Sequence, residues 1–283
     1  DGQVQLLCSS APGANIRRAG QDFAEGDALL RAGSVLDARR LSLAAAAGYG
    51  TLPVYRRPRV AVLSTGDELV MPGTRPGPGQ ISASGGVAVE AMLRNSGAEV
   101  ISLGIARDDE AALHEAITRA EGLDVLITIG GASVGDRDLV RPVLAGAGFT
   151  LDFWKIAMRP GKPLMVGRRG DMTVLGLPGN PVSSFVCALV FAEPLIRRMA
   201  RLPGPRRAGK ARSAVAIEAN GSRLHYMRAR FTDASCTTVT PCESQDSSLM
   251  ATLARADCLI ALPPHASGVA AGDMVDILHL DSV

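Results

Sequence analysis

The pattern of hydrophobic and polar positions divides the chain into three parts. From residue 59 onward, short apolar runs alternate with amphipathic stretches that have helical spacing. Strands are predicted at 60–63, 100–103, 125–129, 164–166 and 173–177, and helices at 86–96, 139–147 and 181–199, with another helix capped by Asp108 or Asp109. Strands separated by helices of this length are typical of a parallel sheet covered on both faces. We therefore predict an α/β fold over 58–202, with a three-layer central domain and a mostly parallel sheet.

The segments on either side have different patterns. Residues 1–57 contain short apolar runs punctuated by glycines and one expected helix at 41–47, which predicts an N-terminal stub. Residues 203–283 contain several β-prone runs and one expected helix near 248–254, which predicts a small C-terminal β-barrel-like domain. The segment 201–212 combines arginines with prolines and glycines and is interpreted as a solvated linker.

Composition narrows the classes of partner. The chain has 30 basic and 28 acidic side chains, a net charge of +2, so neither a nucleic acid nor an anionic membrane is expected as a partner. The five cysteines contain no Cys-x-x-Cys pair, which argues against a disulfide framework or a zinc ribbon and favours the reducing cytoplasm. Only three of the 30 basic residues are lysines, and Lys155 and Lys162 lie seven positions apart.

Two of the loops that follow predicted strands carry acids and glycines. Ligands of open α/β sheets bind beyond the carboxyl ends of the strands. In the segment 64–69, Asp67 and Glu68 could hold Mg²⁺, although Asp67 could equally cap a turn while Glu68 is solvated. The segment 130–138 could cradle a phosphate with backbone N–H groups or bind a metal or heterocycle, or form a glycine turn in which Asp138 caps the next helix. Its candidate binding residues are Gly130, Gly131, Ser133, Gly135, Asp136 and Asp138.

Two further loops carry groups that suit anions. In the segment 154–163, Lys155, Arg159 and Lys162 would suit a ligand with several phosphate or oxyanion groups. The segment 177–181 predicts a helix start with Asn180 as N-cap and Pro181 in the first helical position. A helix start at a strand end also attracts anions, and the candidates there are Pro178, Gly179, Asn180 and Ser183.

Taken together, these four loops resemble the signatures of the molybdopterin molybdenumtransferases, the family of MoeA and the gephyrin E-domain. The resemblance extends to the segment 15–33, which is similar to the end of the family's elongated N-terminal region, and to the residues after 212, which resemble its C-terminal β-barrel. Because the chain starts at Asp1, we expect that the beginning of that N-terminal region is missing.

The resemblance implies a function in molybdenum cofactor biosynthesis. Members of the family insert molybdenum from molybdate into adenylylated molybdopterin, use Mg²⁺ and release AMP. By position, Glu68 resembles the essential acid near the metal, Asp138 the pterin-binding aspartate, and Lys155 and Lys162 the substrate-binding lysines, while Arg159 stands where a lysine is common. The resemblance also implies a homodimer, with the molybdopterin adenylyltransferase as a further candidate partner.

The segment 80–85 departs from the family pattern. Ala83 stands where an aspartate is usual and Gly85 where an asparagine is usual, which removes one expected contact to metal or substrate. Two alternatives therefore stand beside the transferase: a non-catalytic molybdopterin-binding relative, and a molybdopterin adenylyltransferase, whose domain shares the glycine-loop fold.

Overall fold

The computed structural model describes residues 2–5, 7–131 and 139–281. Contacts within the chain separate residues 1–54 from residues 55–283. In the first unit, α1 spans Ala38–Ala46 and begins at Asp37, whose carboxylate accepts a hydrogen bond from the backbone N–H of Arg40. The helix expected at 41–47 is thus confirmed, with its start three residues earlier because Asp37 provides the cap.

The centre of the second unit is a six-stranded sheet in the order β4-β1-β5-β9-β8-β6. The first four strands are parallel, and the last two run antiparallel to their neighbours at one edge. The strands are β1 (Arg59–Thr65), β4 (Glu99–Ala106), β5 (Val125–Ile129), β6 (Thr150–Phe153), β8 (Met165–Arg169) and β9 (Met172–Leu177), and a separate ribbon pairs β2 (Leu69–Val70) with β3 (Ile81–Ser82). The predicted mostly parallel sheet is confirmed.

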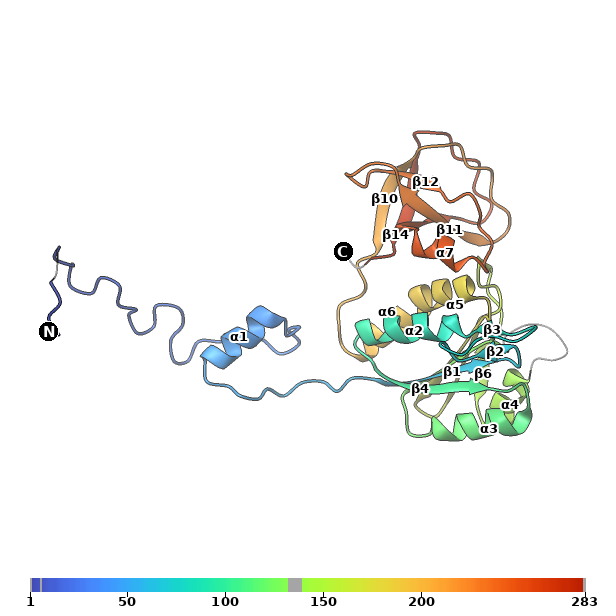
Figure 1. The fold of residues 1–283 in the computed structure, drawn as a ribbon, viewed down its shortest axis with the longest axis horizontal. Coiled ribbons are helices and arrows are strands. Elements are labelled where there is room, and N and C mark those ends of the chain that lie inside the picture. The colour runs from blue at the N-terminus through green and yellow to red at the C-terminus, as the bar shows by residue number, and fades with distance from the viewer. Residues whose placement is uncertain (1, 6, 132–138, 282–283) are drawn as a thin grey trace. The chain divides into compact units, whose positions relative to one another are not determined.

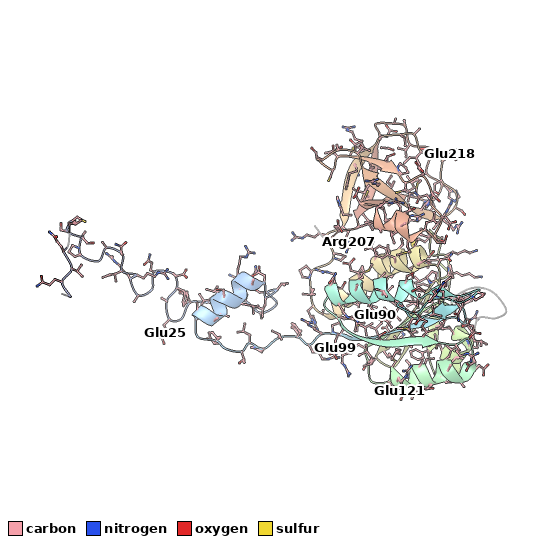
Figure 2. All side chains as sticks on the ribbon, in the orientation of Figure 1. Glu25, Glu90, Glu99, Glu121, Arg207 and Glu218 are labelled. Carbon is pink, nitrogen blue, oxygen red and sulfur yellow. The ribbon has the colours of Figure 1, made fainter. Side chains whose placement is uncertain are left out.

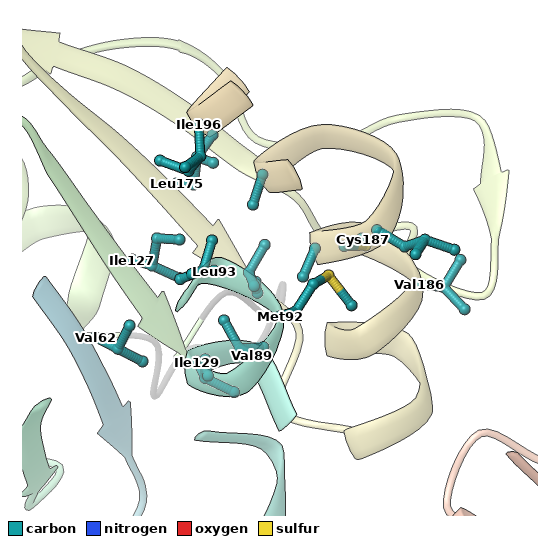
Figure 3. Close-up of a cluster of buried hydrophobic side chains, with 14 of the residues drawn as sticks. Val62, Val89, Met92, Leu93, Ile127, Ile129, Leu175, Val186, Cys187 and Ile196 are labelled. Carbon is teal, nitrogen blue, oxygen red and sulfur yellow. The ribbon is translucent and has the colours of Figure 1, made fainter. Parts of the chain in front are cut away.

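Helices cover both faces of this sheet, which gives the three expected layers (Figure 1). On one face lie α2 (Ser84–Asn95), α5 (Pro181–Cys187) and α6 (Glu193–Met199), the last two joined by a π-helical turn over Ala188–Ala192. On the other face lie α3 (Glu110–Arg119) and α4 (Val140–Gly146). Figure 3 shows how side chains of α2 and of the segment 181–199 meet the apolar face of the sheet, with Leu93 beside Ile127 and Ile196 beside Leu175.

The C-terminal strands close into a five-stranded barrel through the pairing of β12 with β11. The strands are β10 (Ala208–Ser213), β11 (Leu224–Phe231), β12 (Thr238–Pro241), β13 (Cys258–Leu262) and β14 (Met274–His279), accompanied by α7 (Met250–Ala254). A short strand from the central domain, β7 (Met158–Arg159), pairs in parallel with the edge of β11. The predicted C-terminal β-barrel is confirmed.

The interpretation of 201–212 as a solvated linker is wrong for its second half. Residues 208–212 belong to β10, in which Ala211 and Ser213 are buried and Lys210 faces outward to Asp276, with 3.2 Å between Nζ and Oδ1. Arg207, labelled in Figure 2, is also buried and pairs with Glu193 of α6, with 2.6 Å between Nε and Oε2. Small and charged residues hid the period-two alternation of this strand, because neither kind looks like a hydrophobic core position.

The five cysteines all lie within the described residues and are free thiols. Burial raises the pKa of Cys187 and of Cys258 to about 12, so both act as apolar packing residues. In the part of the chain that the structure describes, no helix combines the length and the hydropathy needed to cross a bilayer.

Candidate functional site

Three of the loops named from the sequence meet at the carboxyl ends of β1, β5 and β9, which are adjacent and parallel. The backbone N–H of Gly130 donates to the carbonyl of Leu177 across 3.1 Å. Gly130 has a φ of +98°, and a Cβ at this position would overlap the carbonyl oxygen of Thr65 and lie 2.8 Å from Thr65 Oγ1, so glycine is required there. Gly179 in turn lies against Gly130. The loops that follow β1, β5 and β9 are therefore in direct contact with one another.

The acidic loop after β1 is built around a tight turn. The backbone N–H of Leu69 donates to the carbonyl of Gly66, and the carbonyl of Glu68 accepts from Ile81 at the start of β3. The Glu68 carboxylate folds back over Gly66, where an added Cβ would lie 2.6 Å from Oε2. Asp67 and Glu68 are both exposed, and Asp67 Oδ1 also lies 3.5 Å from Nε of Arg107, so a cation at Asp67 would compete with this ion pair.

Asp108 adds a third carboxylate that sequence reasoning missed. It follows β4, the neighbour of β1, and its backbone N–H donates to Asp67 Oδ1 across 3.3 Å. Burial raises the pKa of Asp108, and the negative charges of Asp67 and Glu68 raise it further. The sequence offered Asp108 only as a possible helix cap, but the carboxylate of Asp109 makes the capping bond to α3. The order of the strands, which the sequence does not state, brings Asp108 to the other two acids.

The starts of two helices lie side by side at the same edge. A Cβ on Gly85 of α2 would lie 3.1 Å from Ser184 Oγ of α5, and one on Gly86 would lie 3.0 Å from Ser64 Oγ of β1. Ala83 is the N-cap residue of α2 and makes no side-chain capping bond. Since both helix starts direct backbone N–H groups toward this edge, they favour negative charge there.

The predicted helix start at Asn180 and Pro181 is confirmed, but the Asn180 side chain does not cap α5. Its Nδ2 donates to Ser247 Oγ of the barrel domain across 3.0 Å, while the backbone N–H of Val182 donates to the Ser247 carbonyl. Gly179 and Asn180 are exposed, whereas Pro178 and Ser183 are buried. The barrel therefore holds this loop through one serine.

The cationic loop is folded back on itself between the sheet and the barrel. The backbone N–H of Ile156 donates to the carbonyl of Lys162 across 3.0 Å, and β7 pairs Arg159 with His225 of β11. Lys155, Arg159 and Lys162 are all exposed. Burial and the positive charge of Arg159, with that of two further arginines, lower the pKa of His225 to about 4. This loop therefore offers three solvated cations to an anion.

The remaining predicted residues, Ser133, Gly135, Asp136 and Asp138, lie outside the described residues. Across the ranges that are described, no three His, Cys, Asp or Glu side chains converge closely enough to form a metal site by themselves. Any metal bound by Asp67 and Glu68 would need further oxygen ligands from water or a substrate, as is usual for Mg²⁺.

Comparisons with known proteins agree along the chain. The family model described as a probable molybdopterin binding domain matches residues 61–198, the MoeA N-terminal region (domain I and II) matches 2–48, and the MoeA C-terminal region (domain IV) matches 210–280. Molybdopterin molybdenumtransferase 2 of Mycobacterium tuberculosis is 36% identical over 98% of this chain and 70% of its own length. The molybdopterin molybdenumtransferase of Haemophilus influenzae is also 36% identical, with the same coverage.

The crystal structure of a molybdopterin biosynthesis MoeA protein from Pyrococcus horikoshii superposes with a TM-score of 0.80 at 28% identity. The match covers 93% of this chain and 65% of that protein, so the chain spans about two thirds of the length of this relative. The similarity therefore includes the central domain, the barrel and part of the N-terminal region.

Proposed function

The chain belongs to the molybdopterin molybdenumtransferase family, and we propose that it acts in molybdenum cofactor biosynthesis by transferring molybdenum from molybdate to adenylylated molybdopterin with release of AMP. The observation that carries this proposal is the separation of charge at one sheet edge. Acids follow β1 and β4, while helix starts and glycines follow β5 and β9, and the exposed cations of 154–163 occupy the neighbouring loop. The substrate carries a pyrophosphate and molybdate is an oxyanion, so the reaction needs groups that bind anions. It also needs carboxylates that can hold a metal cation.

The phosphate-binding side would use Lys155, Arg159 and Lys162 together with the backbone of Gly131, while Gly130, whose N–H is bonded to Leu177, would set the shape of the loop. Cations and N–H groups offset the charge of the pyrophosphate and hold it in place. Asp136 and Asp138, with Ser133 and Gly135, are proposed to bind the pterin, as the resemblance implies. Pro178, Gly179, Asn180 and Ser183 complete this side, with Ser183 acting through its place in α5 because its side chain is buried.

The acidic side would hold Mg²⁺ through Glu68 and Asp67. The residues fit this cation, because Asp67 and Glu68 are exposed carboxylates in one loop and the backbone N–H of Asp108, a third acid, donates to Asp67. When bound, Mg²⁺ would neutralise the negative charge that develops on the leaving phosphate. Glu68 and Asp67 orient that side of the substrate, and Asp108 adds to the negative potential that attracts the cation.

We also propose a homodimer and transient contact with the molybdopterin adenylyltransferase, which would deliver the adenylylated substrate. Free thiols on all five cysteines favour the cytoplasm as the location. The comparisons favour a molybdenumtransferase over an adenylyltransferase. The barrel over 210–280 matches a MoeA region, and the curated relatives are named as molybdenumtransferases.

The test is incubation with adenylylated molybdopterin, Mg²⁺ and molybdate, measuring AMP release and cofactor formation. Glu68→Gln is expected to lower turnover by at least 10²-fold, on the order of an acid that acts directly at the reacting centre. Glu218→Gln, on an exposed residue of the barrel domain, is the matched control and should keep full activity. Equal activity of the two variants would remove Glu68 from the mechanism.

A second test addresses the cationic loop. Lys162→Ala should weaken binding of pyrophosphate-bearing ligands more than binding of the bare pterin, because the lysine is assigned to the phosphates. Lys210→Ala removes the exposed lysine of β10 and should change neither affinity. Tight binding without AMP release by the unaltered chain would instead favour a non-catalytic molybdopterin-binding relative, an alternative that the uncharged Ala83 at the start of α2 supports.

A further inference from the structure

The single tryptophan of the chain lies at the same sheet edge as the proposed site. Trp154 directly follows β6, and since β6 is antiparallel to β8 and β8 to β9, the end of β6 lies at the same sheet edge as the carboxyl end of β9, with β8 between the two strands. Arg141 is the second residue of α4, which follows β5 and so begins at this edge as well. The guanidinium carbon of Arg141 lies 4.3 Å from the centroid of the Trp154 ring.

This pair presents an aromatic surface to solvent. Arg141 stacks on the indole, yet Trp154 remains 41% exposed, among the large hydrophobic residues that the fold leaves in water. Trp154 therefore keeps aromatic surface in water at the end of a sheet strand, next to a loop with exposed cations. A guanidinium below an indole also fixes the ring orientation, so a planar ligand would meet a preformed platform.

The surroundings indicate what the platform would take. Lys155 is the next residue, and Lys162 is tied into the same loop by the hydrogen bond from Ile156 N–H to its carbonyl. An aromatic surface with two exposed cations in its own loop suits a flat ring that carries a phosphate a few bonds away. Stacking tolerates any ring with a π-face, whereas the ammonium groups select for the phosphate.

We propose that Trp154 and Arg141 form a stacking subsite for a planar nitrogen heteroaromatic ring joined to a phosphate. The assignment rests on the proposed function, in which adenylylated molybdopterin carries two such rings, adenine and pterin, joined through a pyrophosphate. Trp154 would position one ring and leave the reacting atoms to the other loops.

Intrinsic fluorescence gives a direct test, because Trp154 is the only tryptophan. The chain is titrated with AMP, with a pterin monophosphate and with ribose 5-phosphate, and affinities are measured in parallel by calorimetry. Saturable quenching by AMP or by the pterin phosphate, without quenching by ribose 5-phosphate, is expected and identifies the ring. Trp154→Leu should weaken that ligand about tenfold, and Trp154→Phe should restore most of the affinity. The affinity for pyrophosphate should be the same in all three proteins.

The matched control is Tyr55→Leu. Tyr55 is also exposed and lies under an arginine, with the Arg201 guanidinium carbon 5.1 Å from its ring, but it precedes β1 and so lies at the opposite, amino end of the strands. Its loss should leave ligand affinity unchanged. Absence of quenching by both ring ligands, or equal affinities of the Trp154→Leu and Tyr55→Leu variants, overturns the proposal. Quenching by a chain that fails to form cofactor would refute the proposed reaction and leave the subsite standing.

Discussion

Replacing Arg207 by leucine should destabilise the chain far more than removing any exposed arginine. The guanidinium donates two hydrogen bonds to the Glu193 carboxylate, with Nε–Oε2 at 2.6 Å and Nη2–Oε1 at 3.1 Å. It also donates to the carbonyls of His279 and Leu280, at 3.0 and 2.5 Å. One side chain therefore connects α6 to the end of β14 across the junction with the barrel.

The expected magnitude follows from burial. Glu193 is 5% exposed and Arg207 is 9% exposed, so Arg207→Leu leaves a carboxylate buried without its partner. Removal of one member of a buried ion pair costs about 3–5 kcal/mol of the free energy of unfolding. Loss of the hydrogen bonds to the two carbonyls should add little to this cost, because His279 and Leu280 are partly exposed and water can replace the lost donor.

A double-mutant cycle separates the charge from the packing. Urea unfolding followed by circular dichroism gives the midpoint and slope for Arg207→Leu, Glu193→Leu and the combined variant. The combined variant should lose less stability than either single variant, because two apolar side chains can pack where two charges had to be paired. Lys210→Ala, which breaks the exposed pair with Asp276, should cost under about 1 kcal/mol. Additive losses in the cycle, or an Arg207→Leu loss as small as that of Lys210→Ala, would refute the reasoning.

Three further predictions concern single positions. The fold lowers the pKa of His225 to about 4, against an ordinary value near 6.5, so the folded chain resists protonation of this side chain. The free energy of unfolding should therefore be highest above pH 6.5 and fall as the pH drops from about 6.5 to 4. His225→Phe should remove this pH dependence, and His114→Gln, at an exposed helix position, should keep it. Gly130→Ala should lower the melting temperature and weaken the binding of phosphate ligands. Gly122 also has a positive φ but has open space around it, so Gly122→Ala should lower the free energy of unfolding only by the conformational cost, about 1–2 kcal/mol. Ala83 is buried, so Ala83→Asp and Ala83→Asn each set a gained capping bond, worth roughly 1 kcal/mol, against the cost of burying a polar side chain, and their melting temperatures should be similar. Only the aspartate should raise Mg²⁺ affinity, which a titration calorimeter would resolve.

The fold could be predicted where a single local signal decided the structure. The buried run 125–129 is β5 with the same bounds, and Asn180 and Pro181 begin α5 as expected. The sequence did not reveal β10, because its inward positions are alanine and serine rather than large apolar residues. Nor could it place β7 beside β11, since a two-residue pairing between separate domains leaves no periodic pattern.

The candidate site was predictable only loop by loop. Ligands bind beyond the carboxyl ends of strands, and this rule predicts Asp67, Glu68 and Gly130 as site residues. It does not predict which loops are neighbours, because that depends on the order of the strands in the sheet. Asp108 illustrates the difference. Its separation from Asp67 in the sequence is 41 residues, and only the adjacency of β4 to β1 brings their loops together. The catalytic and binding roles of these residues stay predictions until the variants are measured.

The two sides of the proposed site depend on different parts of the fold. The phosphate side is held by the barrel, because β7 pairs with β11 and Ser247 accepts the hydrogen bonds of Asn180 and Val182. The acidic side is held by the central sheet and its ribbon, through the bonds of Glu68 to Ile81 and of Asp108 to Asp67. A loosened junction between the barrel and α6 should therefore disturb the phosphate loops first. In the Arg207→Leu variant, affinity for pyrophosphate should fall while affinity for Mg²⁺ alone is kept, and a parallel loss of both would show that the two sides form one rigid structure.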